Sequence, residues 1–146
     1  MFNSSNDKFG RDALMLALPR AEARRWPQRP TLSCLHGQRL ISYSPYEASY
    51  FYQLVHGHLS RANVTPEIVD YVPQIHTMLA LVDSGIGVAL IPENASRLHF
   101  EGVVRRRIET TPARPVEMVV SYRKDNDNPI LKVFRAEVRE ALKARH

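Results

Sequence analysis

The stretch LALVDSGIGVALIP, residues 79–92, places two glycines between two apolar segments of different period. Before the glycines, apolar side chains recur at intervals of three and four residues, which is typical of one face of a helix. These side chains are Ile75, Met78, Leu79 and Val82. After the glycines, residues 88–91 form a continuous apolar run that ends at Pro92, as in a strand buried on both faces of a parallel sheet. The stretch therefore predicts the order helix, glycines, strand.

A glycine pair of this form also occurs in phosphate-binding loops, but its surroundings here exclude that function. A dinucleotide site needs the order strand, glycines, helix, so that a helix N-terminus meets the pyrophosphate. Here the glycines follow a helix C-terminus, whose negative dipole end repels phosphate, and Leu90 occupies the place of a third glycine. We therefore expect Gly85 to be a left-handed C-cap and Gly87 to let the strand turn back closely under the helix.

Length and composition indicate one ordinary globular domain. The chain has 146 residues, of which 44% are hydrophobic. No apolar run approaches the roughly 20 residues that span a bilayer, and the N-terminus shows no signal-peptide pattern. The single cysteine, Cys34, cannot form an internal disulfide. These features favour a cytoplasmic protein with no membrane partner.

The charge balance is basic, with a formal net charge of +5 and a pI near 9.7, which is compatible with a nucleic-acid partner. The arginines are scattered, however, and the only run is Arg105-Arg106-Arg107. In a strand, the middle residue of such a run points away from its two neighbours, so the run makes no single basic stripe. We therefore interpret the charge as a solvated surface.

Strand and helix patterns alternate along the chain. Strands are predicted at 11–18, 38–43, 66–72, 87–91, 102–108 and 116–122, and helices at 45–61, 73–85 and 128–144. Residues 1–10 are polar and are expected to be loose. This alternation is typical of an α/β domain with a mixed, mostly parallel sheet flanked by helices.

Two turns are the best candidates for a binding site. Ser42, Tyr43, Ser44 and Pro45 follow one predicted strand, and Val72, Pro73 and Gln74 follow another. Ligands of open parallel sheets bind outside the carboxyl ends of the strands. Both turns lead into helix N-termini, where free N–H groups and the positive dipole end suit a small carboxylate. The alternative is that Ser44 only caps a helix and that Pro73 only begins one.

Catalytic and metal-binding patterns are weak, so the sequence predicts no enzyme, no metal and no cofactor. His56 and His58 point about 200° apart on a helix and cannot share a metal ion. Ser84 lacks the nucleophile elbow of serine hydrolases. Cys34 has no neighbours in sequence that mark a catalytic thiol, apart from His36 and Arg39.

Five segments, in order, resemble the effector-binding domain of LysR-type transcriptional regulators over about residues 12–142. They are DALMLALPR (12–20), TLSCLHGQRLISY (31–43), IHTMLALVDSGIGVALIP (75–92), GVVRRRIE (102–109) and VEMVVSYRKDNDNPILKVFRAEVRE (116–140). The third, a helix followed by two glycines and a strand, is the most recognisable stretch of that family. No single motif is diagnostic, but the ordered set is fairly specific.

The resemblance implies a periplasmic-binding-protein-like (type 2) fold, in which two α/β lobes enclose a ligand cleft. Residues 1–146 then correspond to a single lobe, the second, with 11–18 and 116–122 as the strands that cross between lobes and 128–144 as the C-terminal helix. The winged helix-turn-helix of the family, its linker helix and most of its first lobe are missing from this sequence.

The function that this resemblance implies is the sensing of a small, anionic effector in the cleft between the lobes. The family's domains pair as dimers and pass closure of the cleft to DNA-binding domains, so DNA would be a partner only through the missing N-terminal domain. The turns at residues 42–45 and 72–74 would form the second lobe's wall of the cleft.

Two other functions remain open at this stage. A stand-alone basic nucleic-acid-binding domain would bind DNA in a strongly salt-dependent way. Against it, five aromatic residues cluster in a segment with no Arg or Lys among them, namely Tyr43, Tyr46, Tyr50, Phe51 and Tyr52. The third possible function is that of a fragment of a solute-binding protein. The lack of a visible signal peptide counts against this hypothesis.

Overall fold

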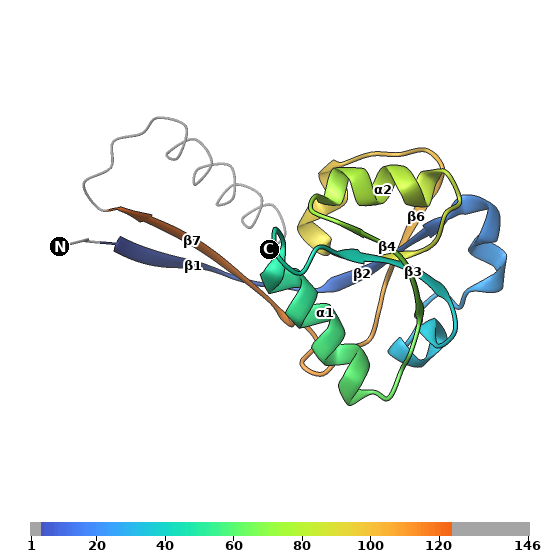
Figure 1. Cartoon of the computed structure of the whole chain (residues 1–146), viewed down its shortest axis with the longest axis horizontal. Helices are drawn as coiled ribbons and strands as arrows, with labels where there is room; N and C mark the ends of the chain where they lie inside the picture. The colour runs from blue at the N-terminus through green and yellow to red at the C-terminus, as the bar shows by residue number, and fades with distance from the viewer. Residues whose placement is uncertain (1–3, 124–146) are drawn as a thin grey trace.

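The body of the protein is built on five strands (Figure 1) in a computed structural model that describes residues 4–123. These strands are β2 (Leu14–Pro19), β3 (Arg39–Tyr43), β4 (Glu67–Val72), β5 (Ala89–Pro92) and β6 (Val103–Arg107). β3 pairs in parallel with β4, whereas β2 pairs antiparallel with both β5 and β6. A parallel bridge between Leu40 and Val88 joins the two groups in the order β4-β3-β5-β2-β6. Only β2 runs against the other four strands of this mixed sheet.

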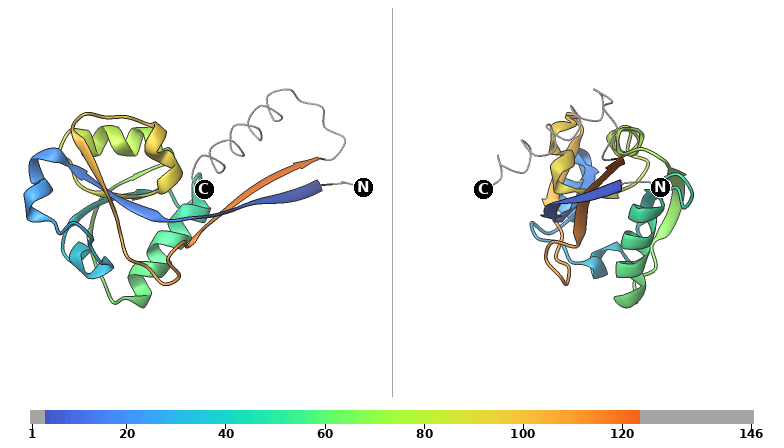
Figure 2. Two further views of the ribbon diagram at one scale, coloured as in Figure 1. Left: turned by 180° about the vertical axis from the view of Figure 1, so that it is seen from behind. Right: turned by 90° about the vertical axis from the view of Figure 1, so that its left-hand side faces the viewer.

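Two α-helices cover the sheet, α1 (Ser49–Arg61) and α2 (Ile75–Asp83). α1 lies in the connection from β3 to its neighbour β4. α2 lies in the connection that runs back from β4, past β3, to β5. Right-handed crossovers in opposite directions place the two helices on opposite faces of the sheet (Figures 1 and 2). Three short 3-10 helices complete the body: η1 (Arg20–Arg25), η2 (Leu32–Leu35) and η3 (Glu93–Arg97).

The N-terminal segment differs from the sequence-based expectation. Residues 4–10, expected to be loose, form most of β1 (Ser4–Asp12), which pairs antiparallel with β7 (Val116–Arg123) in a ribbon that extends from the body (Figure 1). Because partner strand β7 supplies the backbone hydrogen bonds, the polar local sequence does not reveal this strand. The single strand predicted at 11–18 is split at Ala13, so residues 14–18 belong to the body and not to the ribbon.

The split follows from a buried carboxylate at the corner between β1 and β2. Asp12 is 1% exposed, and its two carboxylate oxygens accept hydrogen bonds from the N–H of Ala13 at 3.0 Å and of Asn94 at 2.7 Å. These bonds fix the direction in which the ribbon leaves the body. The helix predicted at 128–144 lies outside the described residues.

α1 begins later than the sequence predicts. Pro45 was expected in its first turn, but the helix starts at Ser49 and residues 45–48 form a separate turn. The Ser44 hydroxyl donates to the Glu47 carboxylate and accepts from the Glu47 N–H at 3.5 Å, while the Ser44 carbonyl accepts from the Ala48 N–H at 3.0 Å. Ser44 therefore closes the turn before the helix and does not cap α1 itself.

The two glycines after α2 have different physical roles. Gly85 has a φ of +81°, and the N–H groups of Gly85 and Ile86 donate to the carbonyls of Val82 and Leu81, which is the hydrogen-bond pattern of a glycine C-cap. A Cβ on Gly87 would lie 2.7 Å from the carbonyl oxygen of Arg39 in β3. Only glycine allows the chain to approach β3 this closely before it continues as β5.

The body's interior is mostly apolar, and among the described residues Ser42 and His56 make a polar contact between β3 and α1. The Ser42 side chain, only 1% exposed, forms a hydrogen bond with Nε2 of His56 at 2.8 Å. Burial lowers the pKa of His56 below its usual value of 6.5, so the ring is neutral at pH 7. Burial, with a contribution from Arg61, also lowers the pKa of His58.

Replacing Gly87 with alanine should destabilise the protein, because the added Cβ would collide with backbone that cannot move without breaking the β3–β5 contact. We expect a loss of about 2 kcal/mol in the free energy of unfolding, measured by urea denaturation. Gly57→Ala is the matched control: there the Cβ meets only the side chain of Arg61 at 3.4 Å. Because alanine favours helix, Gly57→Ala should stabilise by about 0.5–1 kcal/mol. Equal effects of the two substitutions would contradict this account.

The two histidines of α1, His56 and His58, should make the protein less stable in mild acid. Their folded-state pKa values lie below 6.5, so the unfolded state binds more protons as the pH falls through 6.5, and stability present above that pH is progressively lost. His56→Gln, which keeps a hydrogen-bonding group near Ser42 but does not titrate, should show a smaller drop in melting temperature between about pH 7 and pH 5. A drop as large as that of the wild type would contradict the assignment to His56.

Candidate functional site

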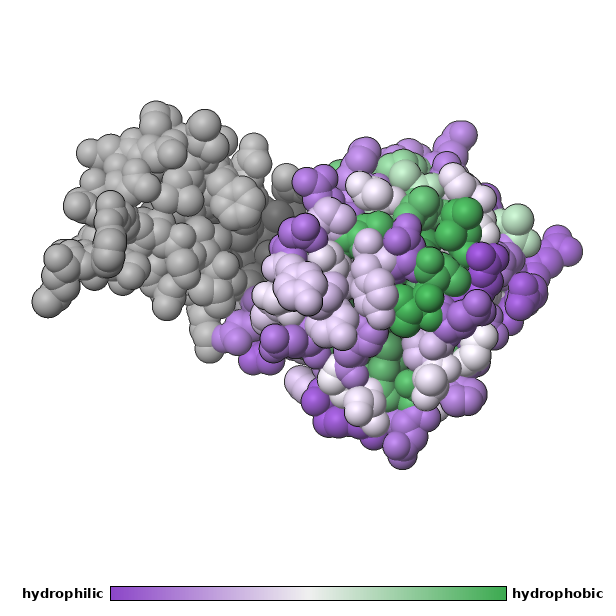
Figure 3. All heavy atoms as spheres, in the orientation of Figure 1, coloured by the Kyte–Doolittle hydropathy of each residue, from purple (hydrophilic) through white to green (hydrophobic). Residues whose placement is uncertain are grey.

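A groove of about 600 Å³ lies where the start of α1 faces the start of α2. It is lined by Tyr43, Glu47, Ala48, Ser49, Tyr50, Phe51, Pro73, Gln74, Ile75, His76 and Leu98. The carboxyl ends of β3 and β4 lead into the two turns beside this groove, at residues 44–48 and 73–74. This is the edge of a parallel sheet at which ligands usually bind. Apolar side chains also gather between α1 and α2, over β3 and β4, on the face shown in Figure 3.

The structure brings only part of the predicted site into this groove. Tyr43, Pro73 and Gln74 line it, whereas the other predicted residues, Ser42, Ser44, Pro45 and Val72, are absent from its lining. The hydroxyl of Ser42 is bonded to His56, and that of Ser44 to Glu47. The two serines that were expected to offer donors to a ligand therefore use their hydroxyls inside the protein. Val72 is buried in the core.

Aromatic side chains form the floor of the groove. Phe51 stacks on Tyr43 with ring centroids 5.1 Å apart and meets Tyr50 edge-on at 5.2 Å. The Tyr43 hydroxyl donates to the Leu90 carbonyl at 2.7 Å, and burial raises the pKa of this phenol, so it stays neutral. This floor offers flat apolar surfaces with little freedom to move.

Sequence reasoning missed several lining residues, chiefly Tyr50, Phe51 and Ile75. Phe51 keeps the helical spacing of core residues, so the pattern alone assigned it to the interior. The signal that could have found the others is their position in the first turns of the two helices, beside the turns that were identified. The side chain of His76 also packs against Phe100, with ring centroids 5.4 Å apart.

The electrostatics of the groove favour an anion. The first hydrogen bonds along the helices are donated by Tyr52 in α1 and Met78 in α2, so the N–H groups of residues 49–51 and 75–77 have no acceptor within their helices. Both positive dipole ends face the groove. Glu47 is its one acidic lining residue, and the carboxylate already accepts the Ser44 hydroxyl. The free N–H groups and the two dipole ends therefore give the groove a positive potential above an aromatic floor.

The described part of the chain shows little that would support chemistry on a bound molecule. The Ser42–His56 pair has the hydrogen bond of a nucleophile and its base, but the serine is buried away from the groove lining. Among the described residues, no three His, Cys, Asp or Glu side chains come together as metal ligands. None of the helices in residues 4–123 is long and apolar enough to cross a membrane.

Comparison with known proteins shows the family to which this chain belongs. The model of the LysR substrate binding domain matches residues 5–143. The HTH-type transcriptional regulator AlsR of Bacillus subtilis (strain 168) is 28% identical over 120 residues, which are 82% of this chain and 39% of that protein. ClcR of Pseudomonas putida, also an HTH-type transcriptional regulator, is 27% identical over 124 residues, which cover 84% and 42% respectively.

Solved structures show the same fold. The LysR family transcriptional regulator CbnR superposes with a TM-score of 0.75 at 23% identity, over 94% of this chain and 47% of that chain. The effector-binding domain of BenM with its effector benzoate gives 0.66 at 15% identity, over 97% and 63%. That of QuiR in complex with shikimate gives 0.67 at 18% identity, over 97% and 66%. These likenesses confirm the predicted periplasmic-binding-protein-like (type 2) α/β fold.

The chain spans about two fifths of the length of the curated relatives that it matches. Since the family model covers nearly the whole chain, the protein belongs to the LysR substrate binding domain family.

Proposed function

We propose that this chain is the effector-sensing part of a LysR-type transcriptional regulator and that its groove binds a small metabolite with a carboxylate group. The observation that carries the proposal is the convergence of two helix N-termini on one aromatic-floored groove. A carboxylate would accept hydrogen bonds from the free N–H groups at residues 49–51 and 75–77. The rest of a flat ligand would lie on Phe51 and Tyr43.

The known relatives support this choice of ligand. BenM has been solved with benzoate and QuiR with shikimate, and both of these ligands carry one carboxylate on a six-membered ring. A ring of that size fits within a groove of about 600 Å³. The groove's open side would be closed by another lobe, so that the ligand lies in a cleft between lobes.

A sensor also needs a route from the ligand to the rest of the regulator. Tyr50, in the wall of the groove, accepts a hydrogen bond from the N–H of Glu117 in β7 at 2.7 Å. β7 and β1 form the ribbon that leaves the body, and we assign them as the strands that cross to the other lobe. A ligand that binds one arrangement of ribbon and groove more tightly than another would shift the population between them.

DNA binding belongs to the complete regulator in this proposal. CbnR has been solved at full length with its target DNA, and this chain corresponds to less than half of that protein. The regulator would act as a dimer in the cytoplasm, with the groove's ligand setting the orientation of DNA-binding domains that lie outside this chain.

Gln74→Glu tests the groove with a change of one atom. Gln74 is exposed, lines the groove and precedes α2, so a carboxylate there would repel an anionic ligand without disturbing the core. We expect the affinity of the chain for benzoate or shikimate, measured by isothermal titration calorimetry, to fall about tenfold, or ~1.4 kcal/mol.

Gln53→Glu is the matched control, because Gln53 is exposed on α1 and is not part of the groove lining. It adds the same charge through the same substitution and should leave the affinity unchanged. Equal losses in the two variants would mean that the ligand senses only net charge. Tighter binding in Gln74→Glu would contradict an anionic ligand at this site.

A further inference from the structure

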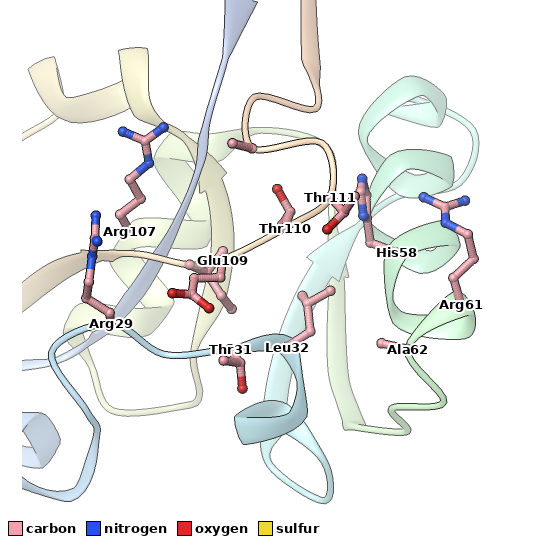
Figure 4. A pocket seen from close by; sticks show the side chains of 12 residues that line it. Arg29, Thr31, Leu32, His58, Arg61, Ala62, Arg107, Glu109, Thr110 and Thr111 are labelled. Atoms are coloured by element: carbon pink, nitrogen blue, oxygen red, sulfur yellow. The ribbon is translucent and has the colours of Figure 1, made fainter.

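A second cavity, of about 930 Å³, lies at the other end of α1 from the groove (Figure 4). Its walls are the last turn of α1, the segment before η2 and the loop that follows β6. It is lined by Arg29, Thr31, Leu32, His58, Arg61, Ala62, Arg107, Ile108, Glu109, Thr110, Thr111 and Ala113. His58 lies nine residues after Ser49, which places the two sites roughly 14 Å apart along the helix axis.

The charge of the lining is strongly positive. Arg29, Arg61 and Arg107 come from three different segments, and Glu109 is the only acidic residue among the lining residues. Within the described part of the chain, none of these three guanidinium groups forms a hydrogen bond or an ion pair. Uncompensated arginines gathered around a hollow are a typical arrangement for an anion site.

The three arginines of the run Arg105-Arg106-Arg107 differ in whether their guanidinium groups have hydrogen-bond partners. The Arg106 guanidinium donates to three backbone carbonyls, including that of Trp26 at 2.6 Å, and the Arg105 guanidinium donates to the carbonyl of Leu98. These two arginines are therefore used to hold the fold. Arg107, without such partners in the described residues, has its guanidinium available at the cavity.

His58 adds a polar ring to the lining of the cavity. Its side chain is only 5% exposed, yet it lines the cavity and has no hydrogen-bond partner among the described residues. Its ring nitrogens are not among the fully buried, unpartnered polar atoms of the described residues, so they can be reached from the cavity and are available to a ligand. Burial keeps the pKa of His58 low, and a neutral ring offers one N–H donor and one acceptor nitrogen.

The helix dipole opposes an anion here but is the weaker effect. The cavity meets the C-terminus of α1, which carries about half a negative charge. Part of it is already satisfied, because the N–H groups of Ala62 and Asn63 donate to the carbonyls of His58 and Ser60. The guanidinium groups each carry a full positive charge and exceed both this dipole and the single Glu109 carboxylate.

We propose that this cavity is a second ligand site, for a small molecule that carries a phosphate group. Figure 4 shows Arg29 and Arg107 at one side of the cavity and His58 and Arg61 at the other, with Glu109 and Thr110 between them. The phosphate would lie at the Arg29–Arg107 side, and the remainder of the molecule would reach the His58 ring. The site does not depend on the carboxylate groove at the start of α1.

The direct test is a nuclear magnetic resonance titration of the whole 146-residue chain with inorganic phosphate, following the ring resonances of His58. Chloride should hold the ionic strength constant. We expect saturable shifts in the millimolar range, and Arg107→Gln should weaken binding at least about fivefold. Arg24→Gln is the matched control: Arg24 is exposed and absent from the cavity lining, so its loss should leave the titration unchanged.

Three results would overturn the proposal. The His58 resonances could stay fixed as phosphate is added, or Arg24→Gln could weaken binding as much as Arg107→Gln. A random DNA duplex could instead move the same resonances at far lower concentration than phosphate, in which case the surface is a nucleic-acid contact. Gln74→Glu should not change the phosphate titration, so failure here is distinguishable from failure of the carboxylate groove.

Discussion

The approach of Gly87 to the carbonyl of Arg39 is the constraint on which the rest of the body depends. β3 and β4 form one hydrogen-bonded group, and β5, β2 and β6 form the other. The groups meet where the N–H of Val88 donates to the Arg39 carbonyl at 2.9 Å and the N–H of Ile41 donates to the Val88 carbonyl at 2.8 Å. Any side chain at residue 87 would occupy the space that this meeting requires. Gly85 brings the chain there by ending α2 in a left-handed conformation.

This junction also positions the groove between the two helix starts. Holding β5 against β3 sets the two crossovers on opposite faces, so that the turns after β3 and β4 open at the same edge of the sheet. The helices that follow these turns point their N-termini at one groove. Tyr43 joins the aromatic floor of the groove to the sheet, because its ring stacks on Phe51 and its hydroxyl donates a hydrogen bond to the Leu90 carbonyl of β5. Packing thus fixes the aromatic floor, and the backbone supplies the donors.

Much of the fold could be predicted from the sequence because its signals are local. The helical spacing before Gly85 predicted α2, and the apolar run after Gly87 predicted β5. The apolar pattern that ends before Pro73 predicted β4. The errors arose where distant parts of the chain decide. Residues 4–10 form a strand only because β7 pairs with them, and Asp12 splits the first predicted strand through a bond to Asn94. The sequence predicted the two turns that border the groove. It did not show that the hydroxyls of Ser42 and Ser44 are bonded to His56 and Glu47, because these contacts depend on how the chain folds around them.

The central claim is that backbone donors at two helix starts form a carboxylate site. Amide chemical-shift mapping of the chain during titration with shikimate or benzoate tests it most directly. The account predicts that the largest shifts fall on residues 49–51 and 75–77, with the ring resonances of Phe51 moving in parallel. Saturable binding with its largest shifts elsewhere, or no shifts at these amides for any small carboxylate, would contradict it.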